Sequence, residues 1–295
     1  HPNSDIMTDP IDLIIPAREG AVGGFTVRRT LPNAKRRMVG PFTFFDHMGP
    51  ADVAPGQDFD VRPHPHIGLA TVTYLFAGEV VHRDSLGSLQ KIKPGDINWM
   101  TAGRGIVHSE RADPARRAEG GRLHGLQLWV ALPTAHEETD PGFDHYPESV
   151  LPKIHQDGTD LTVLAGQLAG AISPVRTLSE LFYGHCVLSP GGRLDLPPDL
   201  GERAAYVVEG AVDIGGRTVG SGEMAVFSDG ILATITASAP ARIMVLGGAP
   251  LDGPRHVWWN FVSSSKDRIE EAKADWAAGR FAPIPGDDDH MPLPG

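Results

Sequence analysis

A β-unit that occurs twice constrains the fold of this chain more than any other feature. The segment Tyr74-Leu-Phe-Ala-Gly-Glu-Val80 aligns with Tyr206-Val-Val-Glu-Gly-Ala-Val212 when their glycines are matched. Similar turns follow, at Pro94-Gly-Asp96 and at Ser221-Gly-Glu223. Apolar residues on both sides of a glycine turn are typical of paired β-strands. The sequence therefore predicts two copies of one β-rich domain.

Composition agrees with this fold class and excludes several functions. The chain has 295 residues, enough for two domains, and its 35 Gly and 26 Pro separate short apolar runs. No run approaches the roughly 20 apolar residues of a membrane-spanning helix. The formal charge of −11, from 37 acidic and 26 basic residues, argues against binding to nucleic acid or anionic membranes, which are themselves negative. Binding to a protein partner stays open.

Two features bear on the location of the protein. The N-terminus lacks the basic region and apolar stretch of a secretory signal. Cys186 is the only cysteine, so no disulfide can form within the chain, and we expect it to be a small buried residue. Both features favour a cytoplasmic protein.

Two short strings, His64-Pro-His66 and His108-Ser-Glu110, indicate a metal site. Residues i and i+2 of a strand point to the same side, so each string offers two potential ligands in one direction. The strings stand at the two ends of a compact run of predicted strands and turns, so three imidazoles and a carboxylate could meet. In the alternative interpretation, the first string lies in a polar loop and His108 caps a turn. Isolated short motifs are often false positives of this kind. The coincidence of two pairs favours the metal site.

The second copy of the β-unit lacks these residues. In the aligned register, Leu196 and Pro198 stand where the first copy has its His-Pro-His string, and neither side chain binds metal. The second half also has no histidine between His185 and His256. We therefore predict one metal ion per chain, in the N-terminal half.

Longer motifs resemble the pirin family of the cupin superfamily. They include His64-Pro-His-Ile-Gly68, Thr71-Val-Thr-Tyr74, His82-Arg-Asp84-Ser85-Xaa-Gly87, Pro94-Gly-Asp96, the run from Trp99-Met-Thr-Ala-Gly103 to His108-Ser-Glu110, Leu126-Gln-Leu-Trp129-Val and Trp259-Asn-Phe-Val262. The resemblance implies an all-β fold of two tandem cupin domains, which are jelly-roll β-barrels, with the metal in the N-terminal one. We place these domains at residues 8–140 and 141–295. The second is expected to lack metal ligands and to include a short C-terminal helix and the tail.

The resemblance also implies a ligand set of three imidazoles and one carboxylate, from His64, His66, His108 and Glu110. Cupins commonly take the carboxylate from their first motif, but an alanine and a threonine stand at those positions here, and Glu110 replaces it. An octahedral ion would keep two positions open. Mixed nitrogen and oxygen ligation suits non-haem Fe(II) and also admits Mn, Co, Ni or Cu, with Zn as the main competitor.

Two functions follow from the resemblance. Some pirin-like proteins act as quercetin 2,3-dioxygenases, which implies a metal-dependent enzyme that takes a flavonol and dioxygen. Glu110 would then also be catalytic, as the base that accepts the proton of the flavonol 3-hydroxyl group. Other members are nuclear transcriptional co-regulators in eukaryotes, which implies the alternative of a non-enzymatic, metal-containing regulatory protein that acts through protein partners. We favour the enzyme.

Other segments are given structural roles. We interpret three other histidines as structural or surface residues: His47, His82 and His124. For each of them, a place in the lining of the pocket is the less favoured alternative. The stretch from Pro133 to Asp160 has little periodicity and is predicted to connect the domains.

The clearest helix signal lies near the C-terminus. Ser264-Ser-Lys-Asp267 has the pattern of a capping box, and Ile269, Ala272 and Trp276 fall on one helical face. This pattern predicts the C-terminal helix.

Overall fold

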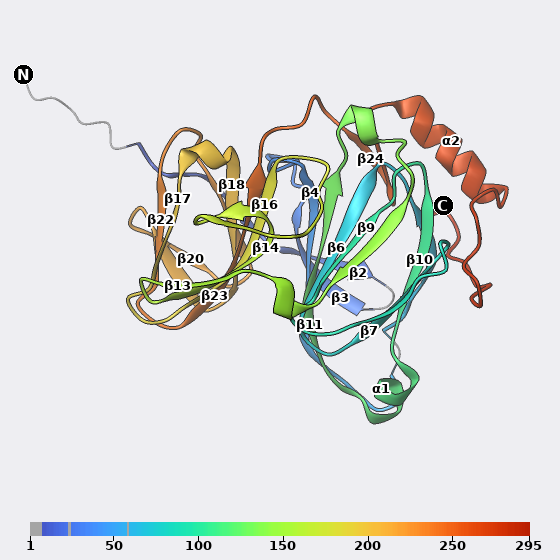
Figure 1. The fold of residues 1–295 in the computed structure, drawn as a ribbon, viewed down its shortest axis with the longest axis horizontal. Helices are drawn as coiled ribbons and strands as arrows, with labels where there is room; N and C mark the ends of the chain where they lie inside the picture. Colours follow the sequence, from blue (N-terminus) through green and yellow to red (C-terminus); the bar gives the residue numbers. More distant parts are fainter. Residues whose placement is uncertain (1–7, 23–24, 58) are drawn as a thin grey trace, which may run out of the picture. The chain divides into compact units, whose positions relative to one another are not determined.

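Two jelly-roll barrels with one strand order make up most of the described chain (Figure 1). The structure is a computed structural model that describes residues 8–22, 25–57 and 59–295. Within these residues, the regular elements are mostly strands, with two α-helices and three short 3-10 turns. The predicted all-β fold with two cupin barrels and a C-terminal helix is confirmed.

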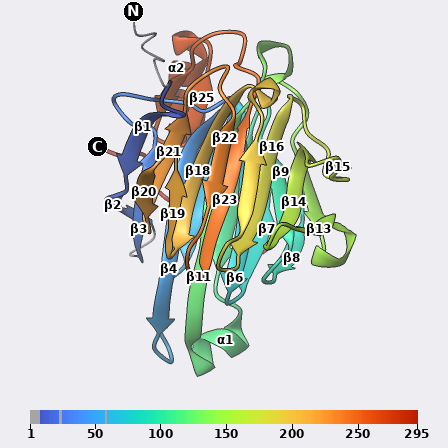
Figure 2. The same ribbon diagram turned by 90° about the vertical axis from the view of Figure 1, so that its left-hand side faces the viewer.

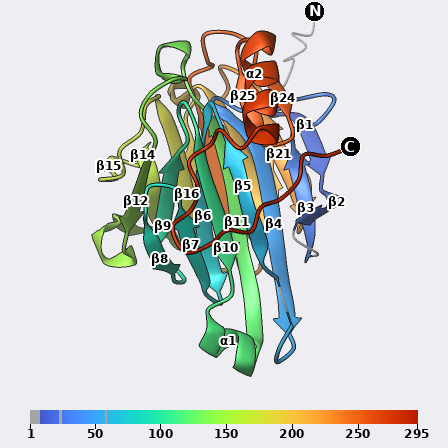
Figure 3. The same ribbon diagram turned by 90° about the vertical axis from the view of Figure 1, so that its right-hand side faces the viewer.

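The N-terminal barrel pairs a larger sheet with a smaller one (Figure 3). The larger sheet has the order β12 (Gly142–Tyr146), β9 (Ile97–Thr101), β6 (Leu69–Ala77), β11 (Gly121–Ala131), β4 (Phe42–Val53), β3 (Phe25–Leu31) and β2 (Arg18–Val22). The smaller sheet has the order β5 (Val61–His66), β10 (Ile106–Arg111), β7 (Val80–Asp84) and β8 (Leu89–Ile92). Apolar residues of both sheets pack together, among them Val53, Leu75, Val80, Ile92 and Leu123.

The C-terminal barrel has the same plan (Figure 2). Its larger sheet has the order β1 (Ile11–Pro16), β21 (Glu223–Phe227), β18 (Glu202–Glu209), β23 (Ala241–Gly248), β16 (Leu181–Leu188), β14 (Thr159–Leu168) and β13 (Lys153–Gln156), and β15 (Ala171–Ile172) pairs with β14. Its smaller sheet has the order β17 (Arg193–Leu196), β22 (Ala233–Thr236), β19 (Ala211–Ile214) and β20 (Arg217–Gly220).

The remaining elements are short. They are α1 (Pro114–Glu119), α2 (Lys266–Ala277), the hairpin of β24 (His256–Trp258) and β25 (Phe261–Ser263), and the 3-10 turns η1 (Thr134–His136), η2 (Glu148–Val150) and η3 (Pro198–Leu200). Neither described α-helix is long and apolar enough to cross a membrane.

The repeat in the sequence is a repeat of structure. In the N-terminal barrel, β6 pairs with β9 and β11, and β7 pairs with β8 and β10; in the C-terminal barrel, β18 pairs with β21 and β23, and β19 pairs with β20 and β22. Gly78 connects β6 to β7 and Gly210 connects β18 to β19, with φ of 87° and 79°. Glycine adopts such positive φ angles at little cost, whereas a residue with Cβ is strained there.

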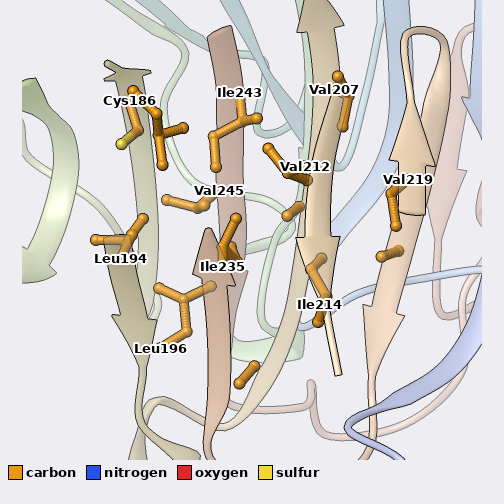
Figure 4. Packing of buried hydrophobic residues seen from close by; sticks show 14 of the residues in the cluster. Cys186, Leu194, Leu196, Val207, Val212, Ile214, Val219, Ile235, Ile243 and Val245 are labelled. Carbon is orange, nitrogen blue, oxygen red and sulfur yellow. The ribbon is translucent and has the colours of Figure 1, made fainter. Parts of the chain in front are cut away.

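Aliphatic side chains fill the interior of the C-terminal barrel (Figure 4). Leu194 and Leu196 of β17 pack in one buried cluster with Ile235 of β22 and Ile243 of β23. Full burial of each such side chain contributes about 1.5–3 kcal/mol. The strand ends at Leu196 because two prolines follow it, and Pro198, predicted to replace a histidine, lies instead in η3.

Both barrels use segments from distant parts of the chain. Among the described residues, one compact unit comprises residues 18–22, 25–32, 42–57, 59–150 and 251–295 and contains the N-terminal barrel; the other comprises residues 8–17, 33–41 and 151–250. These units differ from a division at residue 140, because β12 pairs with β9 and β1 pairs with β21. Each added strand covers an edge that would otherwise leave backbone groups unpaired. The stretch predicted as a connector thus carries the strands β12 and β13.

The C-terminal helix forms where the sequence predicts it, with a shifted cap. The Ser265 hydroxyl oxygen accepts a hydrogen bond from the Arg268 backbone N–H, so Ser265 is the N-cap. Ser264, the predicted cap, instead donates its N–H and O–H to the Glu137 carboxylate, each at 2.8 Å. Ile269 and Ala272 are buried, as expected for the apolar face.

The C-terminal tail, residues 283–295, is irregular and lies along β5 and β10 (Figure 3). The Met291 N–H donates to the Pro63 carbonyl at 2.7 Å. Asp287 pairs with Arg111 of β10 at 2.9 Å. The tail therefore contacts the two strands that carry the histidine strings.

Candidate metal centre

Register in the smaller N-terminal sheet brings the predicted histidines together. β5 and β10 are antiparallel, and His64 lies directly opposite His108. His66 stands two residues from His64 on the same face, because side chains alternate along a strand. All three imidazoles therefore project to one side of the pair.

The three rings form one compact, buried group. Their nearest ring nitrogens all lie within 4.8 Å of one another, and the residues are 6%, 2% and 1% exposed for His64, His66 and His108. The Nε2 atoms of His66 and His108 are 3.2 Å apart. Two nitrogens bound at right angles to one ion, at about 2.1 Å each, would stand about 3.0 Å apart. The spacing of this pair thus suits a single ion.

Backbone carbonyls orient two of the rings. The Nδ1 of His64 lies 2.7 Å from the Arg62 carbonyl oxygen, and that of His66 lies 3.0 Å from the Asn260 carbonyl oxygen. A carbonyl only accepts, so each Nδ1 carries the hydrogen and each Nε2 keeps a lone pair. Metal-binding histidines are commonly held by such outer contacts.

A glycine allows the Asn260 segment to reach His66. Ile67 forms a bridge with Phe261. The next residue, Gly68, has φ of 71°, and a Cβ there would stand 1.8 Å from the Val262 carbonyl oxygen. Any larger residue would separate the two backbones, and the outer contact of His66 would be lost with them.

Burial keeps the imidazoles neutral. It lowers the pKa of His64 to about 4, although the hydrogen bond to the Arg62 carbonyl raises that pKa. Burial, together with the neighbouring histidines, lowers the pKa of His66 and His108 well below the ordinary value. A neutral imidazole is the form that binds a metal ion. At neutral pH the group therefore offers nitrogen donors without competition from protons.

Glu110, the predicted fourth ligand, lies outside the compact group of donors. A register shift separates His108 from Glu110 on the β5 side of β10, so the two residues are not equivalently placed. Its carboxylate accepts a hydrogen bond from the Gln127 side-chain amide at 2.7 Å. Burial raises the pKa of Glu110 to about 7, against the lowering effect of that hydrogen bond. The carboxyl group can therefore gain or lose a proton near neutral pH.

A small, mostly apolar cavity adjoins Glu110. Its volume is about 30 Å³, enough for one or two water molecules. Thr73 and Gln127 are its other polar lining residues. Its apolar lining consists of Val22, Phe25, Val27, Met48, Phe59, Val61, Val80 and Leu123.

Comparison with known proteins places the chain in a family. The sequence model described as Pirin matches residues 24–130, and that of the Pirin C-terminal cupin domain matches residues 183–282. This chain belongs to the pirin family. A pirin-like protein of Caulobacter vibrioides is 53% identical over 290 residues, which cover 96% of this chain and 99% of that one.

Two further pirin relatives have names that specify an activity. A Pseudomonas aeruginosa protein, provisionally named a quercetin 2,3-dioxygenase, is 42% identical over 259 residues, covering 87% of this chain and 80% of its own. A crystal structure described as quercetin 2,3-dioxygenase from Acinetobacter baumannii has a TM-score of 0.89 at 34% identity, covering 96% of this chain and 95% of that one. The predicted resemblance to the pirin family is confirmed.

Sequence reasoning missed several polar neighbours of this pirin site. His82 of β7, interpreted as structural or surface, is buried, and its Nδ1 lies 3.5 Å from the Nδ1 of His108. Asp84, whose carboxylate contacts His82, stands with it in a motif of the family resemblance but was given no role at the site. The i, i+2 spacing of His82 and Asp84 could have placed them on one face. Gln127 and the Asn260 carbonyl gave no such signal, because the contacts depend on strands distant in sequence.

His47 and His124 lie apart from the three-histidine group. Both are buried, and their Nε2 atoms are 2.9 Å apart. Arg28 contacts the Nδ1 of His47 at 2.9 Å. Neither histidine lines the cavity beside Glu110, so their interpretation as structural residues fits their positions.

Proposed function

We propose that this pirin is a metal-dependent dioxygenase of flavonols, with quercetin 2,3-dioxygenase activity. One observation carries the proposal: a buried group of three neutral imidazoles lies near a carboxyl group that titrates near neutral pH. The names of the Pseudomonas and Acinetobacter relatives support it. The buried, unpaired Cys186 supports a cytoplasmic location.

The proposed ligands of one divalent ion are His64, His66, His108 and Glu110. The first three already present nitrogen donors at suitable spacing. Glu110 would join them by turning away from Gln127, which now holds its carboxylate. Three nitrogens and one oxygen favour Fe(II), with Mn, Co, Ni, Cu and Zn as alternatives, because affinity alone does not select among these ions.

The residues around the site have defined tasks in this proposal. The ion supplies Lewis acidity that lowers the pKa of a flavonol 3-hydroxyl group when it is bound. Glu110 is the buried carboxylate proposed to accept the hydroxyl proton as general base. Gln127 holds the Glu110 carboxylate before it turns toward the ion. The apolar lining excludes water and contacts the aromatic rings of the flavonol.

Flavonol binding requires the cavity to widen. Pockets for ligands of this size commonly measure about 300–1,000 Å³, whereas the cavity beside Glu110 has about 30 Å³. The aromatic rings of Phe25 and Phe59 line it. We place the opening at these side chains, between β3 and the segment that leads into β5.

The small cavity also favours the second candidate function. A pirin whose cavity admits only water would act as a metal-containing regulatory protein that binds a protein partner. In that case the ion would alter the surface that the partner recognises. Substrate turnover separates the two functions, because only the enzyme consumes dioxygen with a flavonol.

Oxygen uptake by metal-loaded protein tests the proposal. Metal-free protein is loaded in turn with Fe(II), Mn(II), Co(II), Ni(II), Cu(II) or Zn(II), and dioxygen consumption with quercetin is compared per bound ion with that of the free ion. Luteolin, which lacks the 3-hydroxyl group, is the matched control and should not be consumed. Rates on quercetin and related flavonols that never exceed those of free ions would overturn the enzyme proposal. A change of surface hydrogen exchange on metal loading would then support the regulatory function.

A further inference from the structure

His108 differs from the other two histidines in what faces its outer nitrogen. Carbonyl oxygens of the backbone face Nδ1 of His64 and of His66. The Nδ1 of His108 instead faces a side chain, the Nδ1 of His82, at 3.5 Å. A carbonyl oxygen can only accept a hydrogen bond, whereas an imidazole nitrogen donates or accepts according to its tautomer. The state of His108 therefore depends on the state of His82.

Asp84 determines the state of His82. The Asp84 Oδ2 lies 2.6 Å from Nε2 of His82, and both residues are buried. The Asp84 Oδ1 accepts hydrogen bonds from the backbone N–H groups of Leu86 and Ser88, at 2.9 and 3.1 Å. These bonds fix the carboxylate with Oδ2 toward the ring. A carboxylate only accepts, so Nε2 of His82 carries the hydrogen.

The fold also holds the His82 ring in place. Phe143 of β12 stacks on it, with 4.0 Å between ring centroids and 11° between planes. In the sheet, Asp84 lies opposite His108 across the β7–β10 pair. The three polar groups therefore form a chain of fixed direction, from Asp84 through His82 to His108.

We propose that Asp84 and His82 are positioning residues that fix the tautomer of His108 and so keep its Nε2 free for the metal ion. With the hydrogen on Nε2, His82 presents the lone pair of Nδ1 to His108. The Nδ1 of His108 then carries a hydrogen and donates it to His82. Its Nε2, 3.2 Å from that of His66, is left with the lone pair that a metal ligand needs. The inference rests on the proposed metal site, although its direct test does not need an ion.

The Asp84→Asn variant reverses the donors and acceptors along Asp84, His82 and His108, with almost no change in the shape of the side chain. The amide oxygen keeps the bonds from Leu86 and Ser88, so the amide N–H₂ faces His82. His82 then accepts at Nε2 and carries its hydrogen on Nδ1, and His108 must accept there and carry its own hydrogen on Nε2. A hydrogen on that atom blocks the metal. We expect the affinity for Co(II), measured by chelator competition at pH 8, to fall about 10–100-fold.

Asp96→Asn is the matched control. Asp96 is a buried carboxylate in the same barrel that lies 3.5 Å from another imidazole, His145. Neither residue belongs to the three-histidine group. The control should bind Co(II) like the unchanged protein, and circular dichroism of both variants should match it.

Nitrogen-15 NMR of metal-free protein gives the direct readout. In the unchanged protein His108 should be protonated at Nδ1 and His82 at Nε2, and Asp84→Asn should exchange both. Wild-type Co(II) affinity in a folded Asp84→Asn protein, or Nε2-protonated His108 in the unchanged protein, would overturn the inference. Should Asp84→Asn not fold, the tautomers of the unchanged protein decide alone. Absence of Co(II) binding by the unchanged protein would refute the proposed ligands, and the tautomers would still decide the positioning role.

Discussion

The two barrels share a strand order, but corresponding interior positions carry polar side chains in one and aliphatic side chains in the other. In the N-terminal barrel, His64 of β5 lies opposite His108 of β10, and His66 lies opposite Ile106. In the C-terminal barrel, Leu194 of β17 lies opposite Ile235 of β22, and Leu196 lies opposite Ala233. The three histidines thus correspond to Leu194, Leu196 and Ile235, all in one buried aliphatic cluster (Figure 4).

This substitution pattern separates the fold from the site. Aliphatic side chains at these positions stabilise a barrel by burial, whereas imidazoles there lose hydration and must find polar partners. The backbone plan tolerates both. The N-terminal barrel therefore gives up stability at three positions in exchange for a polar group that can hold an ion.

Making the first interior like the second should have the largest effect. The triple variant His64→Leu, His66→Leu, His108→Ile copies the corresponding C-terminal residues. We expect the metal content, measured by elemental analysis, to fall from one ion per chain to none while the β-fold persists. The unfolding free energy of metal-free protein should rise by about 1–3 kcal/mol, because aliphatic burial is favourable and imperfect packing offsets part of the gain.

His155→Leu is the control for this change, since His155 is an exposed histidine of the other barrel. It should leave the metal content unchanged. Two firmly held ions in the unchanged protein, or an ion retained by the triple variant, would contradict the comparison.

Loss of the Glu110 carboxylate should slow turnover. Glu110→Gln keeps the size of the side chain but removes nearly all its basicity. The rate of oxygen uptake with quercetin, expressed per bound ion, should fall about 10²–10⁴-fold, since this is the usual contribution of a general base. Rates must be divided by bound metal because weaker ion binding would also slow turnover. An undiminished rate per ion would leave an enzyme whose base is another group.

Acid should weaken the metal-free N-terminal barrel. Burial lowers the pKa of His47 to about 3 and of His64 to about 4, from 6.5. Both are neutral in the folded state, so their contribution is complete above pH 6.5 and is lost as pH falls toward 4 and 3. For His64 alone the loss is on the order of 3 kcal/mol. Chemical unfolding of metal-free protein at pH 7 and pH 4.5 should show it.

The triple variant sharpens this test, because it lacks three of the depressed imidazoles. Its unfolding free energy should decline less between the same two pH values. An equal decline in both proteins would assign the acid sensitivity to groups outside the site.

The sequence predicted much of this arrangement for identifiable reasons. Strand alternation and the two histidine strings depend on neighbours in the chain, so His64, His66 and His108 could be placed on one face. Their outer contacts could not, because the Asn260 carbonyl approaches His66 only through the pairing of Ile67 with Phe261. The alignment of the two copies was two residues off at β17, because it matched Leu196 and Pro198 to the histidines in place of Leu194 and Leu196. The aligned glycines carry no information about where the prolines end that strand.

The position of Glu110 and the limits of the two domains also depend on contacts between segments that are distant in sequence. Its i, i+2 spacing from His108 predicted a shared face, but a register shift on one side of β10 and the amide of Gln127 draw the carboxylate away from the donor group. Whether it binds the ion stays a prediction. β1 joins the sheet of the C-terminal barrel, and β12 joins the sheet of the N-terminal barrel. Which sheet each strand joins depends on the open edges that the finished sheets offer, and this is a property of the whole fold.

The smallest expected effect concerns the flanks of the two barrels. The cavity of about 30 Å³ in the N-terminal barrel is lined by residues of β2, β3 and β5, and the corresponding strands β13, β14 and β17 line one of about 550 Å³ in the C-terminal barrel. The cavity beside Glu110 is thus the smaller of the two. Phe59→Ala removes a ring from the lining of the smaller cavity. If quercetin must displace this ring, the variant has a larger binding-competent fraction, and KM should fall several-fold with little change in kcat.

Leu168→Ala, in the lining of the larger cavity, is the matched control and should leave both constants unchanged. A higher KM in the Phe59→Ala protein would mean that the ring contacts the flavonol and is part of the binding surface. A lower KM together with an unchanged metal content would place the barrier to substrate entry at this side chain. The difference between the barrels would then concern access as well as ligands, because the aromatic ring would limit entry to the cavity beside Glu110, whereas the larger cavity of the other barrel adjoins Leu194 and Leu196 of an aliphatic core.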